Sequence, residues 1–592
     1  MTHLNSLRTS ESFISRFDTA VKKGPTSIAL KINRRQISYI ELQQRAFGFA
    51  SCLAKHLDAE VDGIVLYLSR SENLIIALLA CQYLGKPYVP VDIRTPESRL
   101  KKMVTASRYL VLHEGKITNS VHPLWLDLNL LKKQAPPCSE FNANLPRSEE
   151  AYRIYTSGST GEPKGVQVLN RGCANLIHSF SQLLAAGSQS HWLSATSISF
   201  DIFYLEYTIP LSHGATLILL DDIQMRSPQE IARQLVRHQP QVFQATPSMF
   251  KSLLPYIPEN WHFSQLLVGG EALGQQLSAQ LFSRSQWLCN VYGPTETTVW
   301  SSAHVIVKPG DVRIGKPIDN TVINILDDEN QPIFTQTAGR IFIGGEGVAL
   351  GYFNNRKLTA EKFLTFKYGG NSSVFYDTGD IGFYDAEGVL NYLNRAGDFV
   401  KINGYRVEIG EIVDALEKIP SVHQAAVVLV ANEAEQEGKL VGWLKTDENS
   451  DVADVLTIRR HLEQQLSHYM IPHYLFFTTQ LPSTMSGKLD SKMLIKMSEE
   501  KLQHAAVGKV TIPASAKVEV VDHPAMVILR DYIGANDFSA DSNFFHYGLS
   551  SMQAVSFHLE LMMLYPQIEL HELFERPTLI SLLAPYDKVL NN

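Results

Sequence analysis

The sequence predicts an α/β protein with mainly parallel sheets, because apolar segments typical of buried strands alternate with segments of helical periodicity. The segment VDGIVLYL (61–68) is typical of a buried strand, SENLIIALLACQYLG (71–85) has helical spacing, and PYVPVD (87–92) is typical of the next strand. A chain of 592 residues is too long for a single core, so two to four domains are expected.

The first of these helices has recognisable ends. Ser71 is a plausible N-cap, and Gly85 is a plausible stop. Leu74, Ile75, Leu78 and Leu79 would share one face of it. The pair Thr95-Pro96 then predicts the start of another helix, since proline is favoured in the first turn.

The pattern changes along the rest of the chain. Between residues 310 and 395, short alternating runs separated by glycine-rich turns predict a small antiparallel section. Residues 396–495 are expected to form a compact α+β segment. Residues 496–520 are polar and lack sustained periodicity, which predicts a linker, and 521–592 have helical spacing.

Composition excludes several classes of protein. A formal net charge of −7 argues against a nucleic-acid partner, which would require a basic surface. The longest apolar segment, 73–85, is too short for a membrane span, and the amino terminus lacks the apolar core of a signal peptide. Five scattered cysteines without a CxxC pair suit reduced thiols. A cytoplasmic protein without membrane insertion is therefore expected.

One loop has the composition of a phosphate cradle. TSGSTGEPKGV (156–166) combines glycines and hydroxyl residues with a single lysine, and backbone N–H groups in such a turn can solvate phosphate oxygens. Glycine follows Lys164 and proline precedes it, so the segment is not a Walker A loop. By itself it also admits the alternative of a flexible surface loop, which the composition favours less.

Further motifs follow this loop in a fixed order. They are NVYGPTETT (290–298), YDTGD (376–380), NRAGDFVKINGYRVEIGEI (394–412) and SGKLD (486–490), with SYIEL, GKPYVPVD, SFDIFYLE and HYMIP between or before them. Over about residues 25–495 the series resembles the adenylation domains of nonribosomal peptide synthetases. The resemblance implies an adenylate-forming fold: two packed α/β sheets and a β-barrel in residues 1–395, then a mobile C-terminal lid in 396–495.

The resemblance also implies a reaction. An amino-acid carboxylate attacks the α-phosphate of Mg-ATP, and a thiol then takes the acyl group and releases AMP. By position, Lys488 would bridge the carboxylate and ribose, Glu296 would bind Mg²⁺, Tyr292 would stack on adenine, and Asp380 would accept the ribose hydroxyls. The remaining nucleotide-binding candidates are Thr156, Ser157, Gly158, Ser159, Thr160, Gly161, Lys164, Asn290, Gly293, Thr295, Arg395 and Lys401. Of these, Thr156 and Lys164 are also expected to act in catalysis together with Lys488.

Two positions depart from the family pattern. Gly397 stands where the family has an acidic hinge residue, which leaves lid rotation possible but puts an acid-based hinge interaction in doubt. Gly339-Arg340-Ile341 replaces the family's G-E-L and is expected to be a structural difference.

The C-terminal segment carries a second resemblance. SNFFHYGLSSMQAV (542–555) resembles the 4′-phosphopantetheine attachment site of peptidyl carrier proteins, with Ser551 rather than Ser550 as the modified residue. Such a serine is expected at the start of a helix. The resemblance implies a small four-helix carrier domain in 521–592 and a phosphopantetheinyl transferase as a partner.

The family's specificity pocket can be assigned residue by residue. Asp201 would accept the substrate's α-ammonium group, and Lys488 would close the pocket. The side-chain end would be lined by Ile202, Leu205, Gln244, Leu267, Gly269, Val291, Val299 and Trp300. Large uncharged walls leave room for hydrogen or a methyl group, and the pattern looks like that of glycine-activating domains. Glycine is the predicted substrate, with alanine second.

Other functions remain open at this point. The carrier that receives glycine could be a separate protein, as in cell-surface glycylation, and the acyl group would pass to a downstream condensation, transferase or tailoring enzyme. An acyl- or aryl-CoA ligase is a second enzyme class, against which Asp201 argues. A non-catalytic ATP-binding scaffold is a third, against which Lys488, Glu296 and Asp380 argue.

Overall fold

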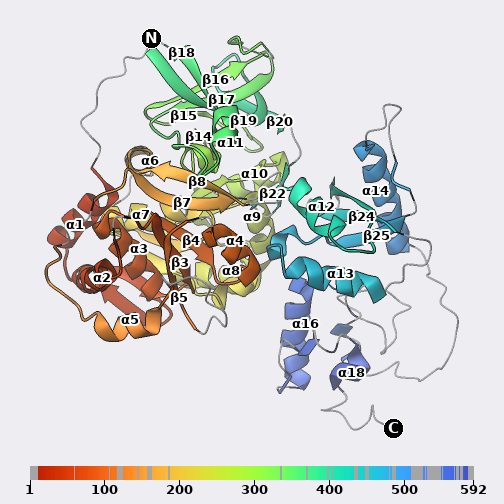
Figure 1. Ribbon diagram of the computed structural model, residues 1–592, viewed down its shortest axis with the longest axis horizontal. Coiled ribbons are helices and arrows are strands. Elements are labelled where there is room, and N and C mark those ends of the chain that lie inside the picture. Colours follow the sequence, from red (N-terminus) through yellow and green to blue (C-terminus); the bar gives the residue numbers. More distant parts are fainter. Residues whose placement is uncertain are drawn as a thin grey trace. The chain divides into compact units, whose positions relative to one another are not determined.

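The computed structural model divides into two compact units, Met1–Ile495 and Lys496–Asn592 (Figure 1). It describes residues 11–592 except 59, 106, 116–124, 143–145, 157–162, 185–186, 328, 334–335, 369–370, 396–398, 403–404, 432–437, 447–452, 479, 483–488, 508–524, 527, 530–543, 545–548, 550, 566, 569–571, 574–575, 577 and 584–592.

The first sheet of the larger unit has the strand order β6-β5-β3-β4-β7-β8. Its strands pair in parallel except for β8, which returns antiparallel to β7. The strands are β3 (Gly63–Leu68), β4 (Tyr88–Asp92), β5 (Tyr109–His113), β6 (Trp125–Asp127), β7 (Glu150–Thr156) and β8 (Lys164–Leu169).

The second sheet has nine strands in the order β15-β14-β13-β12-β11-β9-β10-β1-β2. Its centre, from β13 to β1, is parallel, and the strands at both edges are antiparallel. The strands are β1 (Ile28–Ile32), β2 (Arg35–Ser38), β9 (His191–Ser194), β10 (Thr216–Leu219), β11 (Val242–Ala245), β12 (Phe263–Gly269), β13 (Ser285–Tyr292), β14 (Ser302–Val305) and β15 (Lys316–Pro317). Two mainly parallel sheets confirm the α/β class expected from the strand–helix alternation.

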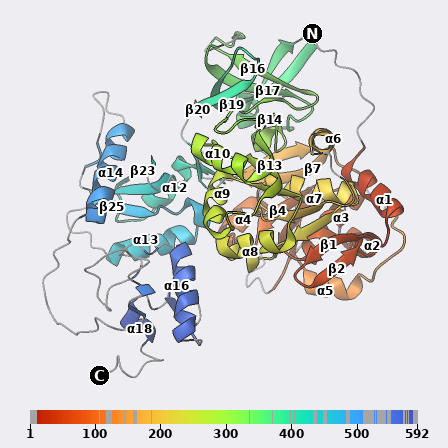
Figure 2. The same cartoon turned by 180° about the vertical axis from the view of Figure 1, so that it is seen from behind.

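Helices cover both faces of both sheets (Figures 1 and 2). The largest core joins both sheets through α1 (Phe13–Lys23), α2 (Tyr39–Ala54), α3 (Glu72–Leu84), α6 (Asn170–Leu183) and α7 (Ile202–Ser212). Helix α4 (Glu97–Thr105) packs on the other face of the first sheet. On the second sheet that outer layer is α8 (Pro228–His238), α9 (Pro247–Leu253) and α10 (Gln275–Ser283), and the short α5 (Leu128–Gln134) contacts α2.

Helix α3 shows where the sequence expectation was too narrow. Gly85 ends the helix in the left-handed conformation, with φ +63°, as predicted. Ser71 occupies the N-cap position, but its hydroxyl makes no capping hydrogen bond to the described first turn. All residues of α3 except Gln82 are buried, not only the predicted face, because a helix between two sheets meets apolar neighbours on every side.

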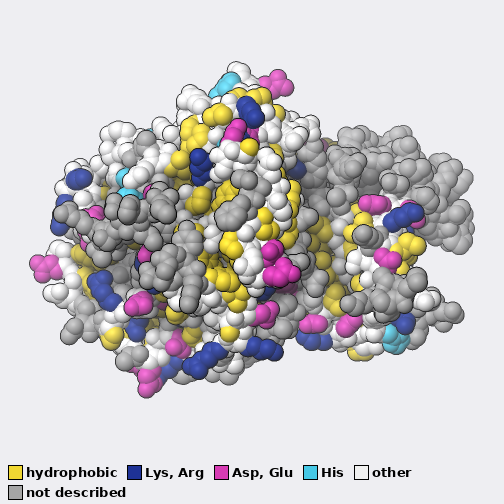
Figure 3. Space-filling view, turned by 90° about the horizontal axis from the view of Figure 1, so that it is seen from above, with side chains coloured by type: hydrophobic (Ala, Val, Ile, Leu, Met, Phe, Trp, Pro, Cys, Tyr) yellow, Lys and Arg dark blue, Asp and Glu magenta, His cyan; other side chains and the backbone are white. Residues whose placement is uncertain are grey.

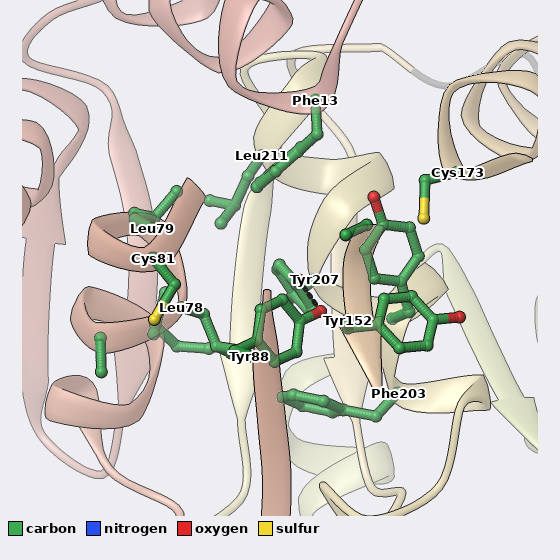
Figure 4. Close-up of a cluster of buried hydrophobic side chains, with 14 of the residues drawn as sticks. Phe13, Leu78, Leu79, Cys81, Tyr88, Tyr152, Cys173, Phe203, Tyr207 and Leu211 are labelled. Carbon is green, nitrogen blue, oxygen red and sulfur yellow. Dashed lines mark hydrogen bonds between the residues drawn. The ribbon is translucent and has the colours of Figure 1, made fainter. Parts of the chain in front are cut away.

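Tyrosines fill part of the core between the sheets (Figure 4). The hydroxyls of Tyr88 on β4 and Tyr207 on α7 lie 2.8 Å apart, and the Tyr152 ring lies 5.7 Å from that of Tyr88. Burial raises the pKa of all three phenols well above the ordinary value, so they are neutral core groups.

The predicted antiparallel section is a five-stranded sheet. Its strands are β16 (Thr321–Leu326), β17 (Gly339–Gly345), β18 (Phe363–Tyr368), β19 (Asn371–Tyr384) and β20 (Leu390–Arg395), with the short helix α11 (Arg356–Lys362) before β18. Arg340 of the Gly339-Arg340-Ile341 variation donates to Asp377 at 3.3 Å and to Asn330 at 2.7 Å. The contact with Asp377 joins β17 to β19.

The described residues between 399 and 478 form both strands and helices. The hairpin β21 (Phe399–Ile402) and β22 (Tyr405–Glu408) leads into α12 (Ile409–Glu417). A three-stranded sheet then combines β23 (Gln424–Ala431), β24 (Gly438–Lys445) and β25 (Tyr474–Thr478), with α13 (Ala453–Glu463) between β24 and β25. Its core contains Leu416, Leu440, Leu462 and Met470.

The segment expected to be a linker is helical over its first half. Helix α14 (Ser491–Val507) covers residues 496–507 of the segment 496–520. Glu, Lys, Leu, Gln and Ala dominate that stretch, and their intrinsic helix preference acts without an amphipathic pattern. In the smaller unit, α16 (Ser551–Leu564) and α18 (Leu579–Leu583) contribute to a core with Leu529, Phe544 and Phe557.

Two surface properties bear on partners. Within the described ranges, every helix is too short or too polar to cross a membrane. On the face shown in Figure 3, basic and acidic side chains are interspersed, and the described residues there form no continuous basic stretch.

Candidate active site

The candidate pocket residues gather at one edge of the nine-stranded sheet. Gln244 lies on β11, Leu267 and Gly269 on β12, and Val291 on β13, each near the carboxyl end of its strand. Carboxyl ends of parallel strands share an edge, which is where open α/β sheets bind ligands. Asp201 and Ile202 reach the same edge at the start of α7, after β9.

Strand register sets the side-chain neighbours. Gln244 pairs with Leu267, and Gly269 pairs with Val291. A Cβ atom on Gly269 would lie 2.3 Å from the Val291 carbonyl oxygen and 2.9 Å from Trp300 Cη2. Glycine is therefore required for the Trp300 indole to approach the sheet this closely.

Hydrogen bonds tie three of the candidate residues together. Trp300 Nε1 donates to Gln244 Oε1 at 3.0 Å, and Gln244 Nε2 donates to the Ile202 carbonyl at 3.1 Å. Gln244 is 2% exposed and Trp300 is 1% exposed. Leu205 and Leu267 are fully buried beside them. The structure thus brings together the residues assigned to the side-chain end of the pocket.

Trp300 follows a strained turn. Thr298 and Val299 have φ values of +63° and +64°, a region that β-branched residues rarely adopt. Hydrogen bonds hold the turn: Thr298 Oγ1 donates to the Gly347 carbonyl at 2.6 Å, and the Ser301 N–H donates to the Tyr292 carbonyl at 2.8 Å. Gly293 is also required, because a Cβ there would lie 2.6 Å from the Val299 carbonyl oxygen. Strain retained at a binding site is typical of a functional constraint.

Asp201 is buried, with 4% exposure, immediately before α7. Its carboxylate makes no capping hydrogen bond to the described first turn of that helix. The preceding loop is anchored by Asp92, which accepts from Ser197 Oγ at 2.8 Å and whose N–H donates to Ser199 Oγ at 2.6 Å. Burial alone would raise the pKa of Asp92, but hydrogen bonds and the charge of Arg94 lower it to about 2. The anchor is therefore ionised at neutral pH.

The glycine-rich loop connects two antiparallel strands. Thr156 ends β7, Lys164 begins β8, and the two residues are paired across the hairpin. The Thr156 hydroxyl is buried and makes no hydrogen bond to any described residue. The loop candidates Ser157, Gly158, Ser159, Thr160 and Gly161 lie outside the described residues.

Lys164 contacts two elements that are distant in sequence. Its Nζ lies 2.9 Å from Glu408 Oε1, at the end of β22, and 5.6 Å from the centre of the Tyr352 ring. Both the lysine and the glutamate are buried, so this charge-assisted bond is only weakly screened by solvent. Three residues later, Glu411 on α12 forms a buried ion pair with Arg99 on α4.

Glu296 and Lys164 both contact Tyr352. The Tyr352 hydroxyl donates to Glu296 Oε1 at 2.6 Å, and Glu296 is 1% exposed. The described residues contain no group of three or more potential metal ligands. One carboxylate suffices for Mg²⁺ when substrate phosphates supply other ligands, so Glu296 fits an ion that enters with a nucleotide.

Asp380 is held by neighbours on two elements. The Tyr292 hydroxyl donates to Asp380 Oδ2 at 2.6 Å, and the Asp380 N–H donates to Thr378 Oγ1 at 3.0 Å. Arg395 on β20 pairs with Asp380 across the strands. The side chains of Arg395 and Lys401 are not among those the structure describes.

The remaining residues that were expected to bind the nucleotide differ in their surroundings. Asn290 donates from its amide to the Val312 and Arg313 carbonyls at 3.2 and 2.9 Å, which anchors a neighbouring loop. Thr295 begins a short 3₁₀ turn, Thr295–Thr297, that contains Glu296. Gly397 and Lys488 lie outside the described residues, as does the side chain of Ser551, whose backbone begins α16.

Three side chains at the site were not singled out from sequence. Tyr352 and Glu408 contact Lys164, and Thr378 supports Asp380. Glu408 and Thr378 lie inside motifs that were recognised, so those motifs could have nominated them. No local signal marks Tyr352, because its partner Glu296 is 56 residues away in the sequence.

Comparisons with known proteins agree with this arrangement. The AMP-binding enzyme family matches residues 17–353, the AMP-binding enzyme C-terminal domain matches 411–488, and the phosphopantetheine attachment site matches 526–584. The dimodular nonribosomal peptide synthase of Bacillus subtilis is 31% identical over 98% of this chain. The chain spans only 25% of the length of that relative.

Two solved structures are also similar. An artificially fused adenylation–PCP di-domain from Klebsiella oxytoca, NpsA–ThdA, is 25% identical, with a TM-score of 0.71 over 84% of this chain and 97% of that one. A four-domain nonribosomal peptide synthetase bound to AMP and glycine is 26% identical, with a TM-score of 0.62 over 98% of this chain and 43% of that one. The chain belongs to the AMP-binding enzyme family, as a nonribosomal peptide synthetase adenylation domain of the adenylate-forming fold followed by a phosphopantetheine carrier domain.

Proposed function

We propose that this protein activates glycine with Mg-ATP and transfers it to the phosphopantetheine thiol on its own Ser551. In the first half-reaction, a glycine carboxylate oxygen bonds to the α-phosphorus of ATP, and the bond from that phosphorus to pyrophosphate breaks. In the second, the acyl carbon passes to the thiol and AMP leaves. Amino-acid adenylation, ATP and a phosphopantetheine carrier follow from the family. The choice of glycine and the roles of individual residues are our proposal.

The observation that carries the choice of glycine is the filled side-chain end of the pocket. Trp300, Gln244, Leu205 and Leu267 are all buried, Trp300 donates a hydrogen bond to Gln244, and the Trp300 indole reaches the backbone at Gly269. We infer from this burial that the walls leave little volume beside the start of α7. The glycine bound to the four-domain relative adds support. A packed wall excludes larger side chains sterically, because enlarging a well-packed site is costly.

The charged groups suit the first half-reaction. Asp201, buried before α7, would accept the α-ammonium of glycine. Lys164 and Thr156 would contact the β,γ-phosphates from the hairpin, and Asp380 would accept the ribose hydroxyls. Lys488 would stabilise the charge that develops between carboxylate and phosphate. Catalysis of this kind depends on positioning and charge neutralisation.

Mg²⁺ is proposed to enter as part of Mg-ATP. Glu296 would hold it together with phosphate oxygens, and the ion would neutralise phosphate charge. The Tyr352 hydroxyl, which donates to Glu296, would keep the carboxylate in place.

The proposal assigns the work to four segments of the chain. Residues 1–395 would bind the substrates, 396–495 would act as a lid hinged near Gly397, 496–520 would connect, and 521–592 would carry Ser551. The start of α16 at Ser551 suits the attachment of a phosphodiester, which free helix N–H groups stabilise. A phosphopantetheinyl transferase would load that serine, and a downstream condensation, transferase or tailoring enzyme would consume the glycyl group.

An ATP–pyrophosphate exchange assay across the common amino acids tests the function. The proposal expects the highest exchange with glycine and the next highest with alanine. Exchange with acyl or aryl acids but not with amino acids would support a CoA ligase instead. No exchange with any acid would support a non-catalytic scaffold.

A second experiment tests the carrier. The holo-protein, incubated with ATP and radiolabelled glycine, should become labelled, and Ser551→Ala should abolish labelling. Exchange should be nearly unchanged in Ser551→Ala, since the half-reactions use different domains. Ser550→Ala is the matched control and should still be labelled. Persistent labelling of Ser551→Ala, or modification at Ser550, would contradict the assignment.

A further inference from the structure

We propose that Gln244 is a positioning residue that sets the depth of the pocket by holding the Trp300 indole through a hydrogen bond. The inference rests on the proposed function, because it names how that site would exclude amino acids larger than its substrate. It adds a positioning role to the place that Gln244 has among the walls of the pocket.

Both ends of the Gln244 amide are engaged inside the protein. Oε1 accepts from Trp300 Nε1 at 3.0 Å, and Nε2 donates to the Ile202 carbonyl at 3.1 Å. The side-chain amide is planar, so one hydrogen bond at its oxygen and one at its nitrogen fix its orientation as well as its position. With 2% of the residue exposed, water cannot replace either partner readily.

The amide therefore links the two ends of the pocket. Ile202 is the first residue of α7 and follows Asp201, the proposed ammonium acceptor, whereas Trp300 forms the side-chain wall. A rigid link between them fixes the distance from the bound ammonium group to the wall. That distance determines whether a hydrogen atom or a methyl group fits on the substrate's α-carbon.

The hydrogen bond matters because packing alone would leave the buried indole N–H without an acceptor. Its backbone follows a turn in which Thr298 and Val299 have positive φ, and its Cη2 lies close to the backbone of Gly269. Buried indole N–H groups usually find an acceptor, and here Gln244 supplies it. Without that acceptor, this rotamer of Trp300 would lose the hydrogen bond that stabilises it.

A double-mutant cycle tests the proposal in the full-length protein. Gln244→Met preserves length and removes both hydrogen bonds, and Trp300→Phe preserves an aromatic wall without an N–H donor. The readout is the ratio of kcat/KM for glycine over alanine in pyrophosphate exchange. In the protein that retains Trp300, Gln244→Met should lower this ratio about tenfold. In the Trp300→Phe background, where the hydrogen bond to Gln244 is already absent, it should lower the ratio less than about threefold.

Gln234→Met is the matched control, since Gln234 is also buried but lies on α8, where it donates to Glu230 at 2.6 Å. It should leave the ratio unchanged. Gln244→Leu completes the same cycle if Gln244→Met does not fold. A ratio that stays within about twofold for Gln244→Met, or that falls equally in both backgrounds, would overturn the proposal.

The cycle separates this proposal from the proposed function. If the unmodified enzyme prefers another amino acid, the choice of glycine is wrong. The cycle is then run with that amino acid and its next larger homologue. If the enzyme prefers glycine and the cycle shows no coupling, only the role of Gln244 is wrong.

Discussion

The side-chain end and the phosphate end of the candidate site are built in different ways. At the side-chain end, Gln244, Leu267 and Trp300 satisfy one another through packing and neutral hydrogen bonds. At the phosphate end, Lys164 contacts Glu408, a charged residue 244 positions away in the sequence. Neutral packing produces a wall of fixed shape, whereas an ion pair can be exchanged for another partner of the same charge.

This difference indicates that the side-chain end selects the amino acid and that the phosphate end exchanges its partners during the reaction. A wall of interlocked side chains discriminates by size and changes little during the reaction. A lysine paired with a carboxylate can release it when phosphate oxygens arrive, because both are anions that offer charge-assisted bonds. Substitutions at the first end should therefore change which amino acid is used, and those at the second end should change rates and nucleotide affinity.

The largest effect is expected from substitution of Lys488. Lys488→Ala should reduce kcat for pyrophosphate exchange by on the order of 10²–10³, because it removes charge stabilisation in the transition state. The amino-acid preference should not change. Lys496→Ala is a matched control, since Lys496 is an exposed lysine that pairs with Glu500 on α14. Exchange within a few-fold of the unmodified enzyme would refute the role of Lys488.

A smaller effect is expected from Glu408. Glu408→Gln removes the carboxylate that competes with phosphate for Lys164, so the KM for ATP should fall, by about tenfold if the exchange is worth one charge-assisted bond. Glu411→Gln is the control, because Glu411 pairs with Arg99 and not with Lys164. Steady-state pyrophosphate exchange at varied ATP concentrations measures the KM for ATP of both variants. An unchanged or raised KM for ATP in Glu408→Gln would show that the ion pair does not compete with nucleotide.

The smallest effect is expected from Tyr352. Tyr352→Phe removes one hydrogen bond to Glu296, so kcat/KM for Mg-ATP should fall about fivefold, the equivalent of ~1 kcal/mol. Tyr376→Phe is the control, because the Tyr376 hydroxyl lies 3.4 Å from that of Tyr352, one step further from Glu296. Equal effects of the two variants would mean that Tyr352 acts through packing alone.

Sequence predicted the parts of this molecule that local chemistry determines. Gly85 ends α3 because a left-handed residue is needed there, and the strand–helix alternation gave the parallel sheets. The resemblance assigned Gln244, Gly269 and Val291 to one pocket, and these residues lie on neighbouring strands.

Contacts between distant segments could not be predicted in the same way. Nothing near Gln244 in the sequence indicates that its amide bonds Ile202 and Trp300, 42 and 56 residues away. The pairing of Lys164 with Glu408 likewise depends on the tertiary fold. Helix α14 was missed for the opposite reason, because intrinsic preference forms a helix there without a periodic pattern.

The central claim is that the pocket selects glycine by being full, and removing its largest wall tests this most directly. Pyrophosphate exchange across the common amino acids is compared for the unmodified enzyme and Trp300→Ala. The variant should gain exchange with alanine, serine or a larger apolar amino acid, while glycine loses only ~1–3 kcal/mol of transition-state binding. An unmodified enzyme that prefers a large amino acid, or a Trp300→Ala variant that remains strictly specific for glycine, would contradict the claim.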